Sequence, residues 1–404
     1  MKIIYIHQYF ITPEMKGGTR SFEMAKRLVS KGHEVHIISS NSGKSNLLKN
    51  EKYTLESGIH VHWIDVNYSN NYSDFRRILS FIMFSILATL KGTKISADIV
   101  FATSTPLTVT IPGYIISRYK KIPMVFEVRD LWPKLPIAMG SLDNRFLRWL
   151  AIKLETFAYK SSKHIVALSD GMKDGVIETG YSKDQITVIP NSCDIELFRF
   201  QHRISNSKSD FRHKYSIPKD CILLIYAGTH GRINGVSYLA KLAKMMQSNK
   251  EFYFITIGDG AEFRSIKNEA EALGILGNNF QMLGPKEKNF IPYAFNAADI
   301  VLSLFIPLPE MEANSANKFF DGLAAGKCIA INYGGWQQDL LKVYDAGILL
   351  TDKLENAKYE LLKLLDNKDK IKQLSENAAK LGESKFSRDQ LVDNLETVFL
   401  NSLK

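Results

Sequence analysis

The chain has 404 residues, of which 45% are hydrophobic and 23% are charged, so its composition is that of a globular protein. This length exceeds what one hydrophobic core ordinarily organises, and it predicts two domains of roughly 200 residues each. No short-period repeat is visible, which excludes a solenoid. The three cysteines have no CxxC or metal-binding spacing, so we expect reduced, buried thiols at Cys193, Cys221 and Cys328.

The net charge of +10 is concentrated in the first half of the chain. Residues 1–199 hold 26 Lys and Arg against 18 Asp and Glu, whereas residues 200–404 hold 26 against 24. Such a local excess indicates an anionic partner, either nucleic acid or an acidic bilayer surface. No zinc-finger, helix-turn-helix or RNP-like pattern is present, so we expect no nucleic acid and favour the membrane.

No segment predicts export or a membrane span. The N-terminal run MKIIYIHQYF is interrupted by His7 and Gln8, which predicts a first buried strand rather than a secretory signal. No apolar run reaches the ~18 residues that a transmembrane helix needs. We therefore expect a cytoplasmic protein that binds peripherally to the inner face of the cytoplasmic membrane.

Residues 75–92, FRRILSFIMFSILATLKG, combine an arginine pair with an unusually apolar stretch. Two interpretations stay open for this segment. It is either an ordinary core helix or an interfacial helix whose apolar side chains meet lipid while Arg76 and Arg77 meet headgroups.

Short apolar runs alternate with helical patterns along the chain, which predicts an α/β fold with parallel sheets. The runs are apolar on both faces, as strands covered by helices on two sides should be. The first half has expected strands at 3–9, 33–39, 97–103, 122–128, 164–169 and 186–190. The second half repeats the pattern at 221–228, 252–258, 280–284, 299–305, 328–333 and 347–350.

This repeated pattern predicts two consecutive Rossmann-like domains. The polar segment 201–210 has the composition of a linker, so we place the boundary near 195–215. The expected parts are two Rossmann-like domains, 1–198 and 199–385, and a final helix, 386–404, that packs back on the first domain.

The segment SANKFFDGLAAGKCIAI, residues 315–331, carries the strongest chemical signal. Ser315 or Asn317 is the expected cap of a helix whose unpaired N–H groups and dipole suit a diphosphate. Lys318 adds a point charge in the first turn, and Asp321 lies where a carboxylate could accept ribose hydroxyls. The alternative is a capped surface helix with an incidental lysine and aspartate.

Glycine-rich turns follow the first expected strand of each half. In YAGTHGRING, Gly228 ends a buried strand and Gly231 permits close approach of a ligand before the next helix. In TPEMKGGTRSFEMAK, Gly17 and Gly18 separate the first strand from the first helix. Both turns suit phosphate binding through backbone N–H groups, but both are also compatible with ordinary tight turns.

The segment FEVRDLWP places Arg129 and Asp130 at the end of a strand, where a ligand cleft is expected in α/β sheets. Asp130 could orient an acceptor hydroxyl or brace Arg129. The alternative is a purely structural Arg–Asp ion pair. No DxD motif is present, so we expect no divalent metal and no cofactor beyond the donor substrate.

These segments together resemble the retaining GT-B glycosyltransferases of family four, also called group 1. The resemblance covers nearly the whole chain and is similar in particular to bacterial O-antigen and capsule transferases of the WbuB type. The matching segments, in chain order, are KGGTRSFEMAKRLVSKGHEVHIIS, FEVRDLWP, LSDGMKDGVIETGYSKDQITVIPNSCDIELF, YAGTHGRINGVSYL, IGDG, AADIVLSL and SANKFFDGLAAGK.

The resemblance implies two Rossmann-like domains with parallel sheets facing a central cleft, and transfer that retains anomeric configuration. It makes 1–198 the acceptor-side domain and 199–385 the nucleotide-sugar-binding domain. It implies a nucleotide-diphosphate sugar donor, with a UDP-linked amino-deoxy sugar such as FucNAc as the expected species. The implied acceptor is a polyprenyl-diphosphate-linked glycan of O-antigen or capsule synthesis. The loop at Gly17–Gly18 would meet the donor, and backbone around Gly284–Lys286 would recognise the base.

The sequence departs from the family pattern at two places. The family commonly has two Glu residues separated by seven positions, but Asp321 stands at the second and Ala313 lies eight residues before it. Glu310 or Glu312 is the candidate for the first role, contact with donor sugar hydroxyls. The family's Arg and Lys–Gly pair becomes Arg232 and Asn234–Gly235, so Lys318 would supply the missing charge.

Three other functions remain as alternatives or are excluded. A nucleotide-sugar epimerase would use the same two-domain shell without a lipid acceptor. An inactive nucleotide-sugar-binding subunit is the non-enzyme alternative, because the first Glu is displaced. A dehydrogenase is disfavoured, because no G-x-G-x-x-G follows the first strand.

Overall fold

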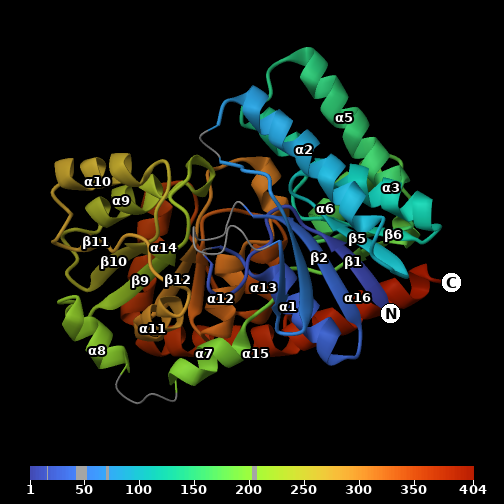
Figure 1. Ribbon diagram of the computed structural model, residues 1–404. Coiled ribbons are helices and arrows are strands. Elements are labelled where there is room, and N and C mark those ends of the chain that lie inside the picture. Colours follow the sequence, from blue (N-terminus) through green and yellow to red (C-terminus); the bar gives the residue numbers. More distant parts are fainter. Residues whose placement is uncertain (16, 42–51, 70–71, 203–206) are drawn as a thin grey trace. The chain divides into compact units, whose positions relative to one another are not determined.

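The computed structural model describes residues 1–404 except 16, 42–51, 70–71 and 203–206 (Figure 1). The chain divides into two compact units. Unit 1 comprises Met1–Pro190 and Arg388–Lys404, and unit 2 comprises Asn191–Ser387. The sequence placed the corresponding divisions at 198/199 and 385/386. Part of the expected linker, 203–206, lies outside the described residues.

Unit 1 is built on an eight-stranded sheet in the order β3-β4-β2-β1-β5-β6-β7-β8. All neighbours are parallel except β3 and β4, and the six strands expected in this half are all present. The central strands are buried on both faces, in keeping with their unbroken apolar runs. The strands are β1 (Lys2–Ile6), β2 (Glu34–Ser40), β3 (Tyr53–Glu56), β4 (Ile59–Ile64), β5 (Ile99–Thr103), β6 (Met124–Val128), β7 (His164–Ala167) and β8 (Ile186–Val188).

The hairpin formed by β3 and β4 was not predicted. Ser57 and Gly58 make its two-residue turn with φ of 50° and 83°, the positive values that such tight hairpin turns require. Strand β3 lies at the edge of the sheet and is exposed on alternate residues, Tyr53 at 48% and Leu55 at 61%. Its short, polar pattern therefore lacks the apolar run by which the other strands were recognised.

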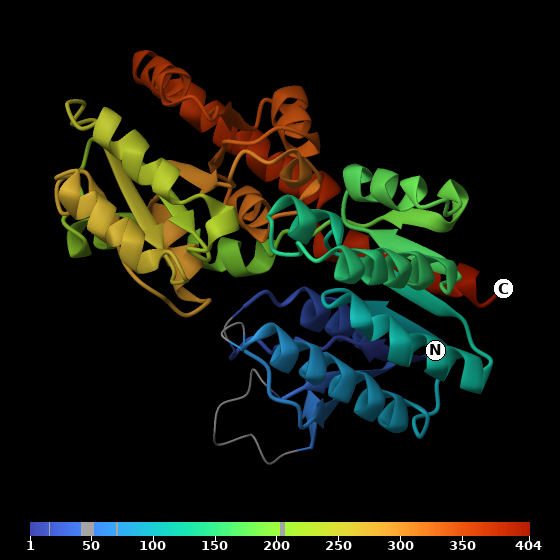
Figure 2. The same ribbon diagram turned by 90° about the horizontal axis from the view of Figure 1, so that it is seen from above.

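Helices cover both faces of this sheet, as Figure 2 shows from a second direction. The last helix of the chain belongs to unit 1, where Leu391, Val392 and Leu395 enter the core. Its Phe399 meets Phe101 of β5 edge-on, with ring centroids 5.1 Å apart. The helices are α1 (Arg20–Ser30), α2 (Asp74–Gly92), α3 (Thr110–Lys120), α4 (Lys134–Ala138), α5 (Arg145–Lys160), α6 (Asp170–Glu178) and α16 (Arg388–Ser402).

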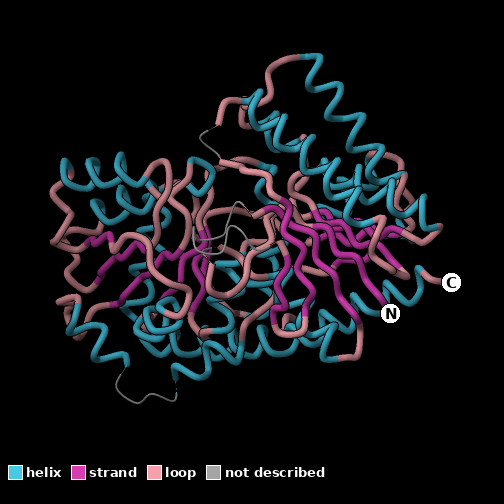
Figure 3. Tube along the Cα trace, viewed as in Figure 1, coloured by secondary structure: helices cyan, strands magenta, loops and turns pink. Residues whose placement is uncertain are grey.

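Unit 2 contains a six-stranded, fully parallel sheet in the order β11-β10-β9-β12-β13-β14, with helices on both sides (Figure 3). All six strands predicted for this half are present. They are β9 (Ile222–Ala227), β10 (Phe252–Ile257), β11 (Phe280–Met282), β12 (Ile300–Ser303), β13 (Cys328–Ile331) and β14 (Gly347–Leu349).

The helices of unit 2 are α7 (Ile195–His202), α8 (Ser207–Lys214), α9 (Ser237–Met245), α10 (Phe263–Ala272), α11 (Phe290–Ala297), α12 (Asn317–Ala324), α13 (Trp336–Tyr344), α14 (Leu354–Asp366) and α15 (Lys368–Lys385). The three cysteines are free and buried, which confirms that prediction. Within the described residues, every helix is too short or too polar to traverse a bilayer.

Candidate functional site

Three glycines bring the loops at the carboxyl edge of the unit 2 sheet into close contact. Gly228 follows β9 and donates its N–H to Ile257 O at 2.9 Å, and Gly258 follows β10 and donates to Gly284 O at 2.9 Å. A Cβ atom on Gly258 would lie 1.9 Å from Gly228 O, so only glycine permits this approach. Backbone from neighbouring strands therefore gathers where ligands bind in parallel α/β sheets.

Lys318 reaches this edge from the first turn of α12. Its Nζ donates to Asn234 Oδ1 at 2.7 Å and lies 4.5 Å from the centroid of the Phe305 ring. The side chain passes so close to Gly228 that a Cβ there would lie 2.9 Å from Lys318 Cδ. The lysine, the glycine turn and Asn234 therefore form one cluster.

The environment of Lys318 opposes its charge. Burial lowers the pKa of its ammonium to about 7, and among the described residues no carboxylate forms an ion pair with it. Two aromatic rings and one amide oxygen are its neighbours. A partly desolvated ammonium without an acidic partner is suited to binding an anion, because the anion supplies the missing counter-charge.

The expected side-chain cap of this helix is wrong. The N-cap residue is Ala316, and the helix begins at Asn317 without a side-chain cap hydrogen bond. Ser315 is occupied elsewhere, because its Oγ accepts the N–H of Asn191 at 3.0 Å. Asn314 Oδ1 takes the N–H of Ala316 at 3.0 Å. The N–H of Phe319 donates to Ala316 O at 3.1 Å, so among the first-turn groups it is those of Asn317 and Lys318 that the phosphate prediction needs.

Three other residues predicted for the phosphate site of unit 2 lie near Lys318 but differ in their exposure. Arg232 lies in the turn Arg232–Asn234 and is exposed, with no ion pair inside the described part of the chain. Asp321 lies one turn beyond Lys318 and is partly buried. Gly231 precedes Arg232 in an extended conformation. Arg232 shares its turn with Asn234, and Asp321 shares α12 with Lys318, so both adjoin the Lys318 cluster.

Glu310 and Glu312 lie in a short 3₁₀ turn, Pro309–Ala313, that precedes α12. Glu312 packs on the turn after β13, where a Cβ on Gly334 would lie 3.1 Å from Glu312 Oε1. Glu310 is partly exposed and makes no comparable contact among the described residues. Glu312 thus lies against the Gly334–Gly335 turn, although it is more exposed than Glu310.

Lys286, predicted for base recognition together with Gly284, does not join the Lys318 cluster. Its Nζ lies 5.5 Å from the ring centroid of Phe290, and the residue is exposed. Gly284 has a φ of 63° and reaches the cluster only through its hydrogen bond from Gly258. A loop with positive φ and an accessible backbone remains compatible with base recognition through main-chain groups.

Unit 1 has its own polar cluster at the carboxyl ends of its strands. Arg129 follows β6, and its Nη1 lies 3.3 Å from Nε2 of His7, which follows β1. The Arg129 N–H donates to Ser104 Oγ at 3.0 Å. No ion pair joins Arg129 to Asp130 in the described part of the chain, so the structure gives no direct support to a purely structural pair. Asp130 is exposed.

His7 was not predicted as a site residue. It is buried, and burial together with the charge of Arg129 holds the pKa of its imidazole well below its usual value. The ring is therefore neutral at physiological pH, and its Nε2 can accept from Arg129. In the sequence, the only signal was a histidine immediately after a buried strand.

Beneath this cluster lies a buried ion pair that the sequence did not reveal. Arg20 Nη2 and Glu127 Oε1 are 2.8 Å apart, and both side chains are at most 2% exposed. Arg20 also donates to the carbonyls of Ile189 and Pro190. Burial alone would raise the pKa of Glu127, but Arg20 and Arg129 outweigh it and leave the pKa lowered. Arg20 lies two residues after the Gly17–Gly18 loop, and Glu127 lies in β6, just before Arg129. The ion pair therefore holds the end of this loop against β6.

Gly17 and Gly18 are themselves exposed and precede α1. Gly17 has a φ of 137°, and a Cβ there would lie 2.8 Å from Ile11 Cδ1. The backbone conformation thus requires glycine at this position. Neither glycine makes a recorded contact with Arg129 or Asp130.

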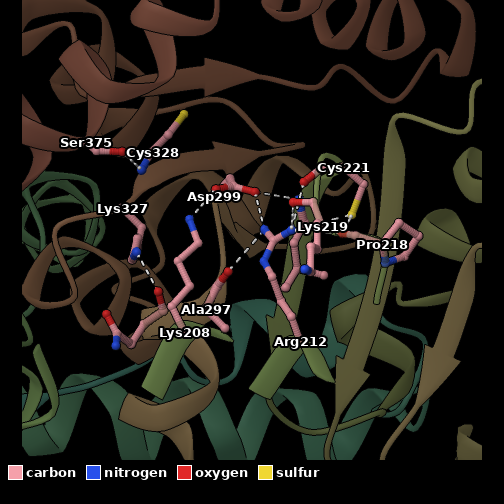
Figure 4. A network of polar contacts seen from close by, with 12 residues as sticks. Lys208, Arg212, Pro218, Lys219, Cys221, Ala297, Asp299, Lys327, Cys328 and Ser375 are labelled. Carbon is pink, nitrogen blue, oxygen red and sulfur yellow. Dashed lines mark hydrogen bonds and ion pairs between the residues drawn. The ribbon is translucent and has the colours of Figure 1, made fainter. Parts of the chain in front are cut away.

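The amino-terminal ends of the strands in unit 2 carry a different polar network, shown in Figure 4. There Arg212 and Lys208 both pair with Asp299, at 2.7 Å and 3.1 Å. Asp299 also accepts the N–H of Leu223 at 2.8 Å, so its oxygens are occupied within the protein. Lys327 lies nearby and donates to the carbonyl of Asn296 at 2.9 Å. This network ties α8 to the starts of β9 and β12.

Comparisons with known proteins agree with this arrangement. Residues 17–197 match the model described as Glycosyltransferase Family 4, and residues 207–381 match Glycosyl transferases group 1. An uncharacterised glycosyltransferase of Methanocaldococcus jannaschii, MJ1069, is 22% identical over 313 residues, which are 76% of each chain.

Two solved structures show the same fold over the full length. Anabaena HepE in complex with UDP-glucose superposes with a TM-score of 0.74 at 16% identity, covering 99% of this chain and 100% of HepE. WaaG, a glycosyltransferase involved in lipopolysaccharide biosynthesis, has a TM-score of 0.74 at 16% identity, covering 98% and 99%. The chain therefore has the two-domain α/β fold of the GT-B class, as predicted.

The two family matches divide between the two halves of the chain and together span most of it. The chain is a glycosyltransferase of the family 4, group 1 kind.

Proposed function

We propose that this glycosyltransferase moves a sugar from a nucleotide-diphosphate donor to a polyprenyl-diphosphate-linked glycan at the inner face of the cytoplasmic membrane. The donor is a UDP-sugar, with an N-acetylated amino-deoxyhexose such as FucNAc as the favoured sugar. The product would serve O-antigen or capsule synthesis. Transfer retains anomeric configuration and needs no metal ion.

One observation carries this proposal: the ammonium of Lys318 lies at a glycine-lined sheet edge without an acidic partner among the described residues. The uncapped start of α12 adds first-turn N–H groups beside it. A diphosphate would satisfy both features, since it offers several acceptor oxygens and two negative charges. The complex of HepE with UDP-glucose supports UDP as the nucleotide.

The proposed chemistry follows from these charges. As the bond between the anomeric carbon and the phosphate oxygen breaks, its electron pair stays on that oxygen. Lys318 and Arg232 then stabilise the growing charge, as preorganised cations do. The acceptor hydroxyl attacks from the same face of the sugar, and its proton passes to the departing phosphate oxygen. Retention follows without a covalent intermediate.

The unit 1 cluster has a different proposed role. The backbone N–H of Arg129 is bonded to Ser104 and its guanidinium contacts neutral His7, so the guanidinium is held at the carboxyl ends of the strands. Asp130 beside it is exposed and is available to orient an acceptor hydroxyl. Glu310 or Glu312 would contact hydroxyls of the donor sugar.

The decisive experiment is a thermal-shift screen of nucleotide sugars, followed by transfer to a polyprenyl-diphosphate-linked glycan in detergent with and without EDTA. We expect stabilisation by a UDP-sugar, EDTA-resistant transfer, and a product whose anomeric proton coupling matches the donor. Epimerised donor in the absence of acceptor would instead favour the epimerase alternative. Donor binding without turnover on any lipid-linked acceptor would favour an inactive binding subunit.

Donor affinity should fall as the pH rises above 7. Because the pKa of Lys318 is about 7 in the free protein, the amine is increasingly neutral above that pH and must take up a proton when the diphosphate binds. The dissociation constant for UDP should therefore rise by about tenfold per pH unit until the pKa of the complex is reached. Calorimetric titration with UDP at pH 6, 7, 8 and 9 measures this. A constant affinity over the range would contradict the assignment.

A further inference from the structure

Helix α2 is oriented with its apolar stripe toward solvent. Seven large apolar side chains on it are 43–78% exposed: Phe75, Ile78, Leu79, Ile82, Met83, Ile86 and Leu90. Their spacing of three and four residues places them on one side of the helix. The hydroxyl residues Ser80 and Ser85 are buried at 7% and 4% exposure and bond to backbone carbonyls of the preceding turn. A helix on a water-exposed surface has the opposite arrangement, with apolar residues buried and polar residues exposed.

The neighbouring helix α3 shows the same inversion. Ile111, Ile115 and Tyr119 are exposed and four residues apart, whereas Thr110 and Ser117 are buried. Helix α5 continues the pattern with six exposed apolar side chains: Phe146, Leu147, Trp149, Leu150, Ile152 and Phe157. Its buried residues include the small Ala151 and Ala158. Three helices of unit 1 thus direct their larger apolar side chains outward.

The three helices are adjacent. Helix α2 packs on α3, and Tyr114 of α3 meets Phe157 of α5 edge-on with ring centroids 5.0 Å apart. Figure 1 shows them together on one side of the unit 1 sheet. We call the exposed apolar residues named above for α2, α3 and α5 the apolar face. Contiguous apolar surface of this extent on a folded protein marks an interaction site.

The charges on these helices are strongly one-sided. Together the sequences of α2, α3 and α5 contain nine Lys and Arg but only two acids, Asp74 and Glu155. The excess of seven accounts for most of the excess of eight in residues 1–199. Burial raises the pKa of Glu155 to about 7, so that one of the two acids is partly neutral. Cations beside exposed aromatic and aliphatic side chains match an anionic lipid surface.

We infer that the apolar face of α2, α3 and α5 is a membrane-docking surface that lies in the headgroup region of an anionic bilayer. The inference rests on the proposed function, because a lipid-linked acceptor must be reached at a bilayer. It extends the single segment 75–92, whose sequence left core and interfacial interpretations open, to three helices. Phe84 and Ala88 of α2 are fully buried while its other side is exposed, so this helix anchors the surface to the core.

The test compares the full chain with a variant in which three exposed residues become polar: Ile82→Gln, Ile86→Gln and Trp149→Gln. Binding is measured by sedimentation with vesicles of phosphatidylcholine alone or with 30% phosphatidylglycerol. We expect at least tenfold stronger partitioning to the anionic vesicles, a decrease with added salt, and at least a tenfold loss in the triple variant. Trp149 should also give a blue-shifted emission on vesicles that Trp149→Phe removes.

A control changes two apolar residues of unit 2 that are more exposed still, Val343→Gln and Tyr359→Gln, at 75% and 61%, and should leave vesicle binding unchanged. Equal binding of the wild type and the triple variant, or no binding to either vesicle, would overturn the inference. A wild-type dimer that the triple variant converts to a monomer would instead make a second copy the occupant, which also overturns it.

The outcome is separable from that of the proposed function. Turnover with a detergent-solubilised acceptor should be unchanged in the triple variant, since none of its residues belongs to the donor or acceptor clusters. Vesicle binding by a protein that never transfers sugar would refute the function and leave the surface standing. Transfer by a protein that never binds vesicles would refute the docking surface and leave the proposed function standing.

Discussion

Replacing Lys318 with methionine should lower kcat/KM for sugar transfer by about 100- to 1,000-fold, which corresponds to ~2.7–4 kcal/mol of lost transition-state stabilisation. The ammonium is positioned by Asn234 and Phe305 and has no acidic partner in the described chain, so its charge is available to the diphosphate. Methionine preserves most of the apolar stem and removes only the charge. Steady-state kinetics at saturating and limiting donor measure the effect.

Lys327 provides a matched control for this substitution. It too is partly buried, and burial lowers its pKa to about 8, but it lies at the other edge of the same sheet and donates to Asn296 O. Lys327→Met should leave the affinity for UDP unchanged. If Lys318→Met also binds UDP and transfers sugar at the wild-type rate, the donor site lies elsewhere. A general loss of folding would instead appear in both variants as a lower melting temperature.

Glu127→Gln should destabilise unit 1 by about 3–5 kcal/mol, because it leaves the charge of Arg20 buried without a counter-ion. Both partners are at most 2% exposed, so water cannot replace the lost interaction. For a unit of this size we expect the melting temperature to fall by roughly 6–20 °C. Thermal unfolding followed by circular dichroism measures it.

The exposed pair of Lys134 and Glu178, at 3.2 Å, is the control for this experiment. Glu178→Gln should change the stability by less than about 0.5 kcal/mol. The pKa of Glu127 is lowered in the folded state, so its contribution is present above the unfolded pKa and is lost as the pH falls through the folded one. The difference between wild type and Glu127→Gln should therefore shrink in acid. A pH-independent difference would contradict a charge-based role.

The local sequence was sufficient for the strands other than β3 and β4, and for the glycine turns at their ends. Buried parallel strands such as β5 and β10 are apolar on both faces, so a short run of β-branched and aromatic residues identifies them wherever they lie in the fold. The edge strand β3 was missed because it is partly exposed and lacks such a run. Its neighbour β4, IHVHWI, was missed as well, although it is mostly buried, because two histidines interrupt its apolar residues. The cap of α12 was mispredicted because Ser315 bonds instead to Asn191, 124 residues away in the chain.

The sequence by itself determined that two largely parallel sheets form, that glycines follow several of their strands, and that Lys318 lies in the first turn of α12. Each of these depends on a pattern within a few residues. Only the tertiary structure decided which groups meet. Lys318 pairs with Asn234 over 84 positions and Arg20 with Glu127 over 107 positions. It also decided that the apolar stripe of α2 faces outward, since helical periodicity reveals that a stripe exists but not which side packs on the core.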